Sequence, residues 1–89
     1  MRTVQLTLSG LVQGVTMRLT VQIYARQHGI VGWVKNMRNG TVAIMAQASA
    51  AEITQFIEWL RYEIPVGRDI SVQVSETVAP QTFDGFKIL

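Results

Sequence analysis

The fold is decided where a strand-like segment turns into a helix-like one, at residues 8–18, which read Leu-Ser-Gly-Leu-Val-Gln-Gly-Val-Thr-Met-Arg. Gly10 and Gly14 free the backbone to curl, so that successive N–H groups point inward. The start of the following helix adds unpaired N–H donors and a partial positive charge, and Arg18 adds a planar fork of donors. These features predict an anion-binding loop, and a phosphate group is the expected ligand.

Hydrophobic periodicity on both sides of this loop predicts the neighbouring elements. Apolar and polar residues alternate over residues 3–9, as in a half-buried strand. Residues 17–28 carry apolar and aromatic side chains at helical spacing and end before Gly29, a residue typical of helix C-termini. Strand-like runs at 30–36 and 41–47 follow, joined by a turn that contains Asn-Gly, and they predict a hairpin.

The second half of the chain predicts one more helix and two short strands. Ser49 and Glu52 form a capping box, and the apolar stripe after them is that of an amphipathic helix. Alternation at residues 70–74 predicts a strand, and residues 83–89 predict a short final strand after a turn at Pro80.

This order of elements predicts a ferredoxin-like α+β fold, with two helices packed on one face of an antiparallel sheet and residues 1–89 in one domain. In a right-handed crossover the first two strands run parallel, so the loop after the first strand and the end of the second open on the same sheet edge. Arg18 and Asn36 are therefore expected to lie together, with Lys35 on the opposite face. The Asn36 amide can donate and accept, which suits the positioning of a water molecule.

Charge is divided unevenly along the chain. Residues 1–51 contain five Lys and Arg and no Asp or Glu, whereas all six acidic residues come later. This distribution favours an anionic partner near the N-terminal elements and leaves no carboxylates there to bind a metal ion or act as a base.

Other compositional features exclude further classes. The chain has no cysteine and one histidine, so we expect no disulfide, no metal site and no nucleophilic triad. No apolar run approaches the roughly 18–20 residues that span a membrane. The first residues alternate like a strand and do not resemble a signal peptide, so a cytoplasmic location is expected. A monomer is expected as well.

The chain resembles the acylphosphatase family through two signatures. Residues 8–18 meet every position of the first, which is an aliphatic residue followed by x-Gly-x-Val-Gln-Gly-Val-x-(Phe or Met)-Arg. The second, Gly-aromatic-Val-Lys-Asn-x-x-x-Gly-x-Val, is met by Gly32, Trp33, Val34, Lys35, Asn36, Gly40 and Val42.

The resemblance implies an enzyme that hydrolyses the carboxyl–phosphate bond of small acyl phosphates without a metal or cofactor. It implies that Arg18 and Asn36 are catalytic and that inorganic phosphate, the product, inhibits competitively. The phosphate would be held by Arg18 and by the backbone N–H groups of the loop residues Gln13, Gly14, Val15, Thr16 and Met17.

Three residues depart from the commoner family pattern. Ala48 stands where glycine usually closes the second signature, and it is expected to change only the turn into the second helix. Met37 replaces a frequent threonine and removes a hydroxyl near the water site, which is expected to lower the rate. Met17 replaces the commoner phenylalanine and is expected to loosen the packing beneath the loop.

Two other functions share features with this sequence. RNA-recognition domains share the order of elements, but they stack bases on aromatic residues of the central strands, and residues 3–9 and 41–47 contain none. No nucleic-acid partner is therefore expected. A catalytically silent anion-binding module, like those inside larger carbamoyl-transfer proteins, is the second alternative, and the short chain argues against it.

Overall fold

The computed structural model describes residues 1–76 and 81–89, and its elements follow the predicted order. They are β1 (Arg2–Leu11), α1 (Val15–Gln27), β2 (Val31–Asn36), β3 (Val42–Ala48), α2 (Ala50–Tyr62), β4 (Arg68–Glu76) and β5 (Phe86–Ile88). Helix α1 begins two residues before the predicted start, and β5 is shorter than predicted. The turn predicted at Pro80 lies outside the described residues.

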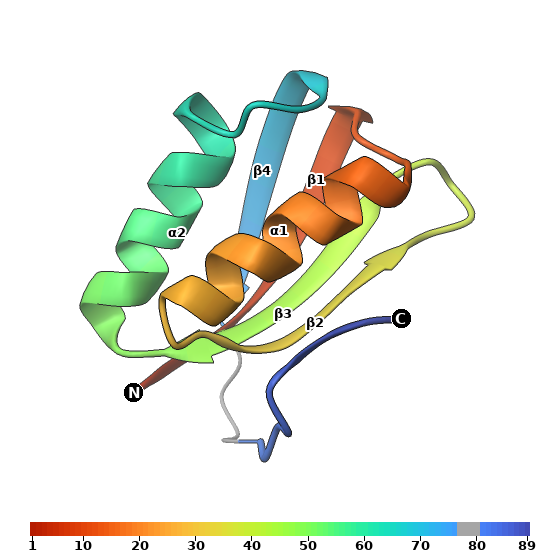
Figure 1. Cartoon of the computed structure of the whole chain (residues 1–89). Helices are drawn as coiled ribbons and strands as arrows, with labels where there is room; N and C mark the ends of the chain where they lie inside the picture. Colours follow the sequence, from red (N-terminus) through yellow and green to blue (C-terminus); the bar gives the residue numbers. More distant parts are fainter. Residues whose placement is uncertain (77–80) are drawn as a thin grey trace.

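The strands form one five-stranded sheet in the order β4-β1-β3-β2-β5, and α1 and α2 both cover the same face of it (Figure 1). Neighbouring strands are antiparallel except β2 and β5, which are parallel, so the sheet that was predicted as antiparallel is mixed. The predicted ferredoxin-like fold, with both helices on one face of the sheet, is confirmed. Strand β4 ends and β2 begins at the same end of the sheet, so the chain enters β5 from the end at which β2 starts.

The core lies between the sheet and the two helices. Val4, Leu6 and Leu8 of β1 point toward the helices and are fully buried, as their alternation predicted. They pack in one apolar cluster with residues of α1 and α2 that recur at helical spacing, which are Met17, Val21, Ala25, Ile53, Phe56, Ile57 and Leu60. Burial of each large apolar side chain contributes about 1.5–3 kcal/mol, so this layer is the main source of stability.

The sheet register sets the relation between the ends of β1 and β2. Both strands pair antiparallel with β3, which lies between them, so β1 and β2 run parallel. Leu8 and Asn36 both pair with Val42 and therefore lie in one row across the sheet. The predicted common edge for the loop and the end of β2 is thus confirmed.

One signature glycine is required by the close approach of β2 to β3. Gly32 has φ 142°, and a Cβ at this position would lie 1.8 Å from the carbonyl oxygen of Met45. Any side chain would push the two strands apart. Gly32 therefore helps to hold the strand that carries Asn36 in its place in the sheet.

Candidate active site

The loop between β1 and α1 keeps its backbone donors open. Gly14 is the N-cap residue of α1, with φ 129° and no side chain to cap the helix, and the first turn of α1 has no acidic residue. Helix α2 shows the usual alternative, since the Ser49 hydroxyl accepts a hydrogen bond from the Glu52 N–H group at 3.2 Å. At α1 the first helical N–H groups, at residues 15–17, are left for an external acceptor.

Gly10 shapes the other end of this loop. Its φ is 107°, and a Cβ there would lie 2.3 Å from the backbone oxygen of Asp69. The loop can therefore pack against the start of β4 only with glycine at this position. Both loop glycines predicted from the sequence thus adopt positive φ, as a curled anion-binding backbone requires.

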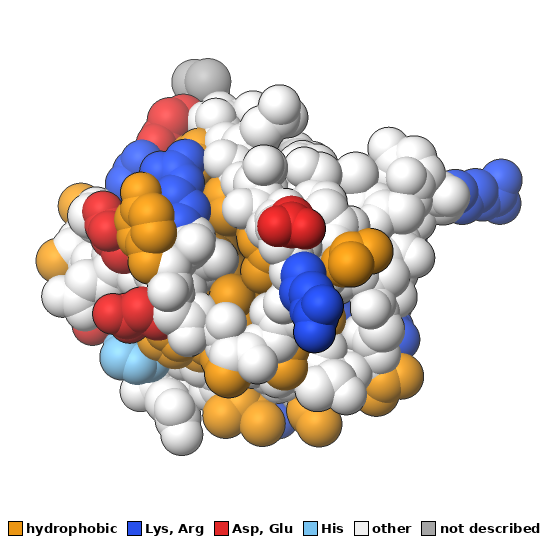
Figure 2. Space-filling view, turned by 90° about the horizontal axis from the view of Figure 1, so that it is seen from above, with side chains coloured by type: hydrophobic (Ala, Val, Ile, Leu, Met, Phe, Trp, Pro, Cys, Tyr) orange, Lys and Arg blue, Asp and Glu red, His pale blue; other side chains and the backbone are white. Residues whose placement is uncertain are grey.

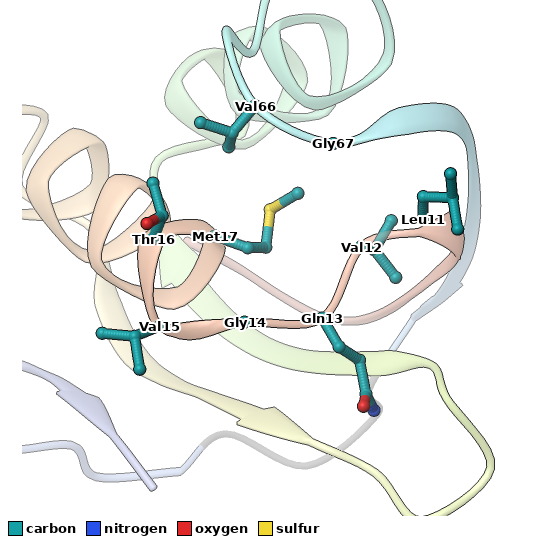
Figure 3. Close-up of a pocket in the computed structure, with 9 residues that line it drawn as sticks. All are labelled: Leu11, Val12, Gln13, Gly14, Val15, Thr16, Met17, Val66 and Gly67. Atoms are coloured by element: carbon teal, nitrogen blue, oxygen red, sulfur yellow. The ribbon is translucent and has the colours of Figure 1, made fainter.

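The loop lines a pocket of about 330 Å³ (Figure 3). Its walls are residues 11–17 together with Val66 and Gly67, and no charged side chain is among them. Met17 extends from α1 toward Val66 and Gly67, and it is 3% exposed. A Cβ on Gly67 would lie 2.8 Å from the Met17 methyl carbon, so this methionine fills the space beside the loop.

Arg18 and Asn36 carry the two buried side-chain polar atoms that have no hydrogen-bond partner in the described part of the chain. These atoms are Nε of Arg18 and Oδ1 of Asn36. A buried polar group without a partner costs about 1–3 kcal/mol, so each such group in a native protein needs an explanation, of which a ligand, an ion or a bound water are the usual ones. Both unpaired atoms belong to the residues that the sequence indicated as a catalytic pair.

Leu89, which follows β5, links Arg18 to β2, the strand that ends at Asn36. Arg18 donates from Nη1 to the backbone oxygen of Leu89 at 3.5 Å, and the Leu89 N–H group donates to the Val34 oxygen at 2.8 Å. Val34 is fully buried against the helices, and Asn36, two residues later, lies on the same face of β2. Lys35 between them is exposed, in agreement with its predicted place on the opposite face.

Asn36 lines a second pocket, of about 350 Å³, with the residues of the β2–β3 turn, so it is separate from the pocket that the loop lines. Arg18 lines neither pocket. The loop and the turn are joined by the Gln13 side chain, whose Nε2 donates to the backbone oxygens of Met37 at 2.6 Å and Thr41 at 3.0 Å. The sequence predicted a role only for the Gln13 backbone, and no sequence pattern indicated the partners of its side chain.

The charge distribution around the site follows the division along the chain. In Figure 2 the side over the β2–β3 turn shows Lys or Arg but no Asp or Glu, whereas most of the acidic side chains lie over α2 and one lies near the centre of the face. No three His, Asp or Glu residues of the described chain lie close enough together to hold a metal ion. His28 ends α1 and pairs with Glu52 of α2 at 3.2 Å.

The fold is that of a ferredoxin-like α+β protein with an uncapped helix start after β1, and comparison with known proteins gives its family. The acylphosphatase family model matches residues 4–88. The acylphosphatase of Shewanella amazonensis is 36% identical over 88 residues, which cover 99% of this chain and 97% of that protein. The crystal structure of acylphosphatase from Bacillus subtilis superimposes with a TM-score of 0.91 at 29% identity and covers 100% of this chain and 99% of that one.

The chain belongs to the acylphosphatase family, and its activity is that of an acylphosphatase, an enzyme that acts on small acyl phosphates. The same fold also occurs in a larger protein. In the structure of HypF from T. kodakarensis, 12% of the chain matches 99% of this one, with 32% identity and a TM-score of 0.80. No helix among residues 1–76 and 81–89 has both the length and the apolar character needed to cross a membrane.

Proposed function

We propose that this enzyme hydrolyses the carboxyl–phosphate bond by one direct displacement, with Arg18 and Asn36 as catalytic residues and without a metal ion or cofactor. The observation that carries the proposal is the pair of buried, unpartnered polar atoms on these two side chains. A bound substrate and its attacking water would supply the missing partners. In the free enzyme, Arg18 Nε and Asn36 Oδ1 would then stay unpaired and already oriented for the ligand, which lowers the free energy of unfolding.

Arg18 and the loop bind the phosphoryl group in this mechanism. The open N–H groups at the start of α1 face a phosphoryl oxygen, and the guanidinium donates to others through its planar fork. Because the charge on these oxygens persists in the transition state, the same donors serve binding and catalysis. Inorganic phosphate presents the same oxygens, so it competes with the substrate.

Asn36 orients the attacking water. Its Oδ1 accepts a hydrogen bond from that water, which then lies in line with the leaving carboxylate. The water oxygen forms a bond to phosphorus while the bond from phosphorus to the acyl oxygen breaks, and the electron pair leaves with the carboxylate. The water proton passes to a phosphate oxygen of the substrate, so no protein base is required.

The lack of acidic residues in residues 1–51 supports this mechanism, because a carboxylate beside the loop would repel a dianionic substrate. The experiment is phosphate release from benzoyl phosphate, measured with and without EDTA. We expect turnover that EDTA leaves unchanged and that inorganic phosphate inhibits competitively. Chelator-sensitive activity restored by Mg²⁺ or Zn²⁺ would overturn the mechanism.

We further propose that the enzyme works as a cytoplasmic monomer. Light scattering at assay concentration tests the monomer, and fractionation of the source cells tests the location.

A further inference from the structure

We propose that the Gln13 side chain is a positioning residue, which holds the water-orienting end of β2 at a set distance from the phosphate-binding loop. The proposal rests on the proposed role of Asn36. The family signature places Gln13 in the loop, where its backbone N–H group is the expected contact to phosphate. Its side chain contacts a different part of the molecule, the β2–β3 turn.

Both amide hydrogens of Gln13 are used by the β2–β3 turn. A glutamine amide nitrogen carries two N–H donors, and here it lies 2.6 Å from the Met37 oxygen and 3.0 Å from the Thr41 oxygen. The side chain points away from Met17 and from the pocket between them (Figure 3). It is therefore committed to the turn and is not a donor to substrate.

The two acceptors enclose the point at which β2 stops. Asn36 forms the last pair of the β2–β3 ladder, and Met37 is the next residue. The turn is closed by a backbone hydrogen bond from the Met37 N–H group to the Thr41 oxygen, at 2.9 Å. Gln13 thus binds the first residue beyond the ladder, directly after Asn36, and ties it to the loop.

This tie crosses the sheet between strands that are not neighbours. Strand β3 lies between β1 and β2, so backbone pairing transmits the position of the loop to Asn36 only through β3. Catalysis by orientation demands that phosphate and water be placed together within a fraction of an ångström. A direct link from Gln13 to the turn meets that demand.

The test replaces Gln13 by two side chains of similar length. Gln13→Met removes the donors, and Gln13→Glu places a carboxylate opposite two carbonyl oxygens. Because Gln13 is exposed, neither change opens a cavity in the core. Arg61→Met is the matched control, since it also removes a hydrogen bond from a side chain to a distant backbone oxygen, that of Val72 at 3.1 Å.

For Gln13→Met we expect kcat on benzoyl phosphate to fall about tenfold, because misplacement by a fraction of an ångström has effects of this size. For Gln13→Glu we expect about a hundredfold, because the carboxylate disrupts the turn and also repels the dianionic substrate. The inhibition constant of inorganic phosphate should change less than about threefold for Gln13→Met, since the loop amides and Arg18 remain. The Arg61→Met control should keep both values.

A double-mutant cycle with Asn36→Ala separates positioning from a general structural role. If Gln13 acts through Asn36, Gln13→Met should lower kcat much less in the Asn36→Ala background than in the wild type. Equal losses in both backgrounds, or a loss of phosphate affinity with kcat kept, would overturn the positioning role alone. Unchanged turnover in Asn36→Ala itself would overturn the proposed function and this inference with it.

Discussion

Replacement of Arg18 by methionine separates a catalytic arginine from a structural one, because the two roles predict opposite effects on stability. Arg18→Met keeps the length of the side chain and removes every donor. Each hydrogen bond between charged groups contributes about 1.5–3 kcal/mol, so loss of a two-pronged grip on phosphate removes about 3–6 kcal/mol. At 1.36 kcal/mol per factor of ten, kcat/KM should fall by about 10²–10⁴-fold.

The free energy of unfolding of Arg18→Met should not fall, although its kcat/KM does. Among residues 1–76 and 81–89 the Arg18 side chain makes one hydrogen bond, at the long distance of 3.5 Å to the Leu89 oxygen, and its buried Nε has no partner. Removal of an unpaired buried donor relieves a penalty of about 1–3 kcal/mol, which outweighs the loss of one weak hydrogen bond. We therefore expect Arg18→Met to match the wild type in stability or exceed it by about 1 kcal/mol.

The assays are steady-state hydrolysis of benzoyl phosphate and unfolding in urea, for the wild type, Arg18→Met and a control, Arg26→Met. Arg26 is exposed in the last turn of the same helix, so the control removes an arginine from α1 away from the loop. A drop of more than about 1 kcal/mol in stability, with kcat/KM within tenfold of the wild type, would mean that Arg18 is structural.

Three further outcomes follow from the same structure. Asn36→Ala should lower kcat by about 10²-fold and leave the inhibition constant of phosphate nearly unchanged. Asn36→Asp should lower kcat at least as much, because it adds a negative charge beside the phosphate. If phosphate affinity is lost while kcat is kept, Asn36 is a binding residue. Gly32→Ala should lower the free energy of unfolding by about 3 kcal/mol, measured in urea, because its Cβ would meet the Met45 oxygen at 1.8 Å; a stability equal to wild type would contradict this. Burial raises the pKa of the Tyr24 phenol above its ordinary 10.0, and Glu52 adds to the effect. Because the unfolded chain releases this proton at a lower pH than the folded chain, the free energy of unfolding should fall as the pH rises past about 10, and it should fall less steeply in Tyr24→Phe. Identical pH profiles of unfolding for the two proteins would refute this prediction.

Much of the fold was predictable because its signals are local. Alternation in β1, helical spacing in α2 and the Ser49 cap each depend on residues close together in the chain. The relation between the loop and the end of β2 followed from the right-handed crossover, and the register across β3 confirms it.

The errors lie where elements distant in the sequence decide the outcome. Strand β4 ends at the end of the sheet where β2 begins, so the chain enters β5 from that end and β5 runs parallel to β2. No pattern within residues 83–89 indicates this direction. Helix α1 starts at Val15, two residues before Met17, which is the first buried residue of its apolar stripe. Hydrophobic periodicity reports burial and does not report such a start.

The sequence by itself determined the family, the order of elements, the exclusion of acidic residues from the first half and the identity of the candidate pair, since each is written in residue types and spacings. Only the tertiary structure decided two other features. Within the described residues, Arg18 Nε and Asn36 Oδ1 are buried without a hydrogen-bond partner, and the Gln13 side chain donates to two backbone oxygens of the β2–β3 turn. The physical reason is that hydrogen-bond satisfaction depends on every group packed around an atom. Those groups come from strands and turns far apart in the chain, and they meet only when it folds.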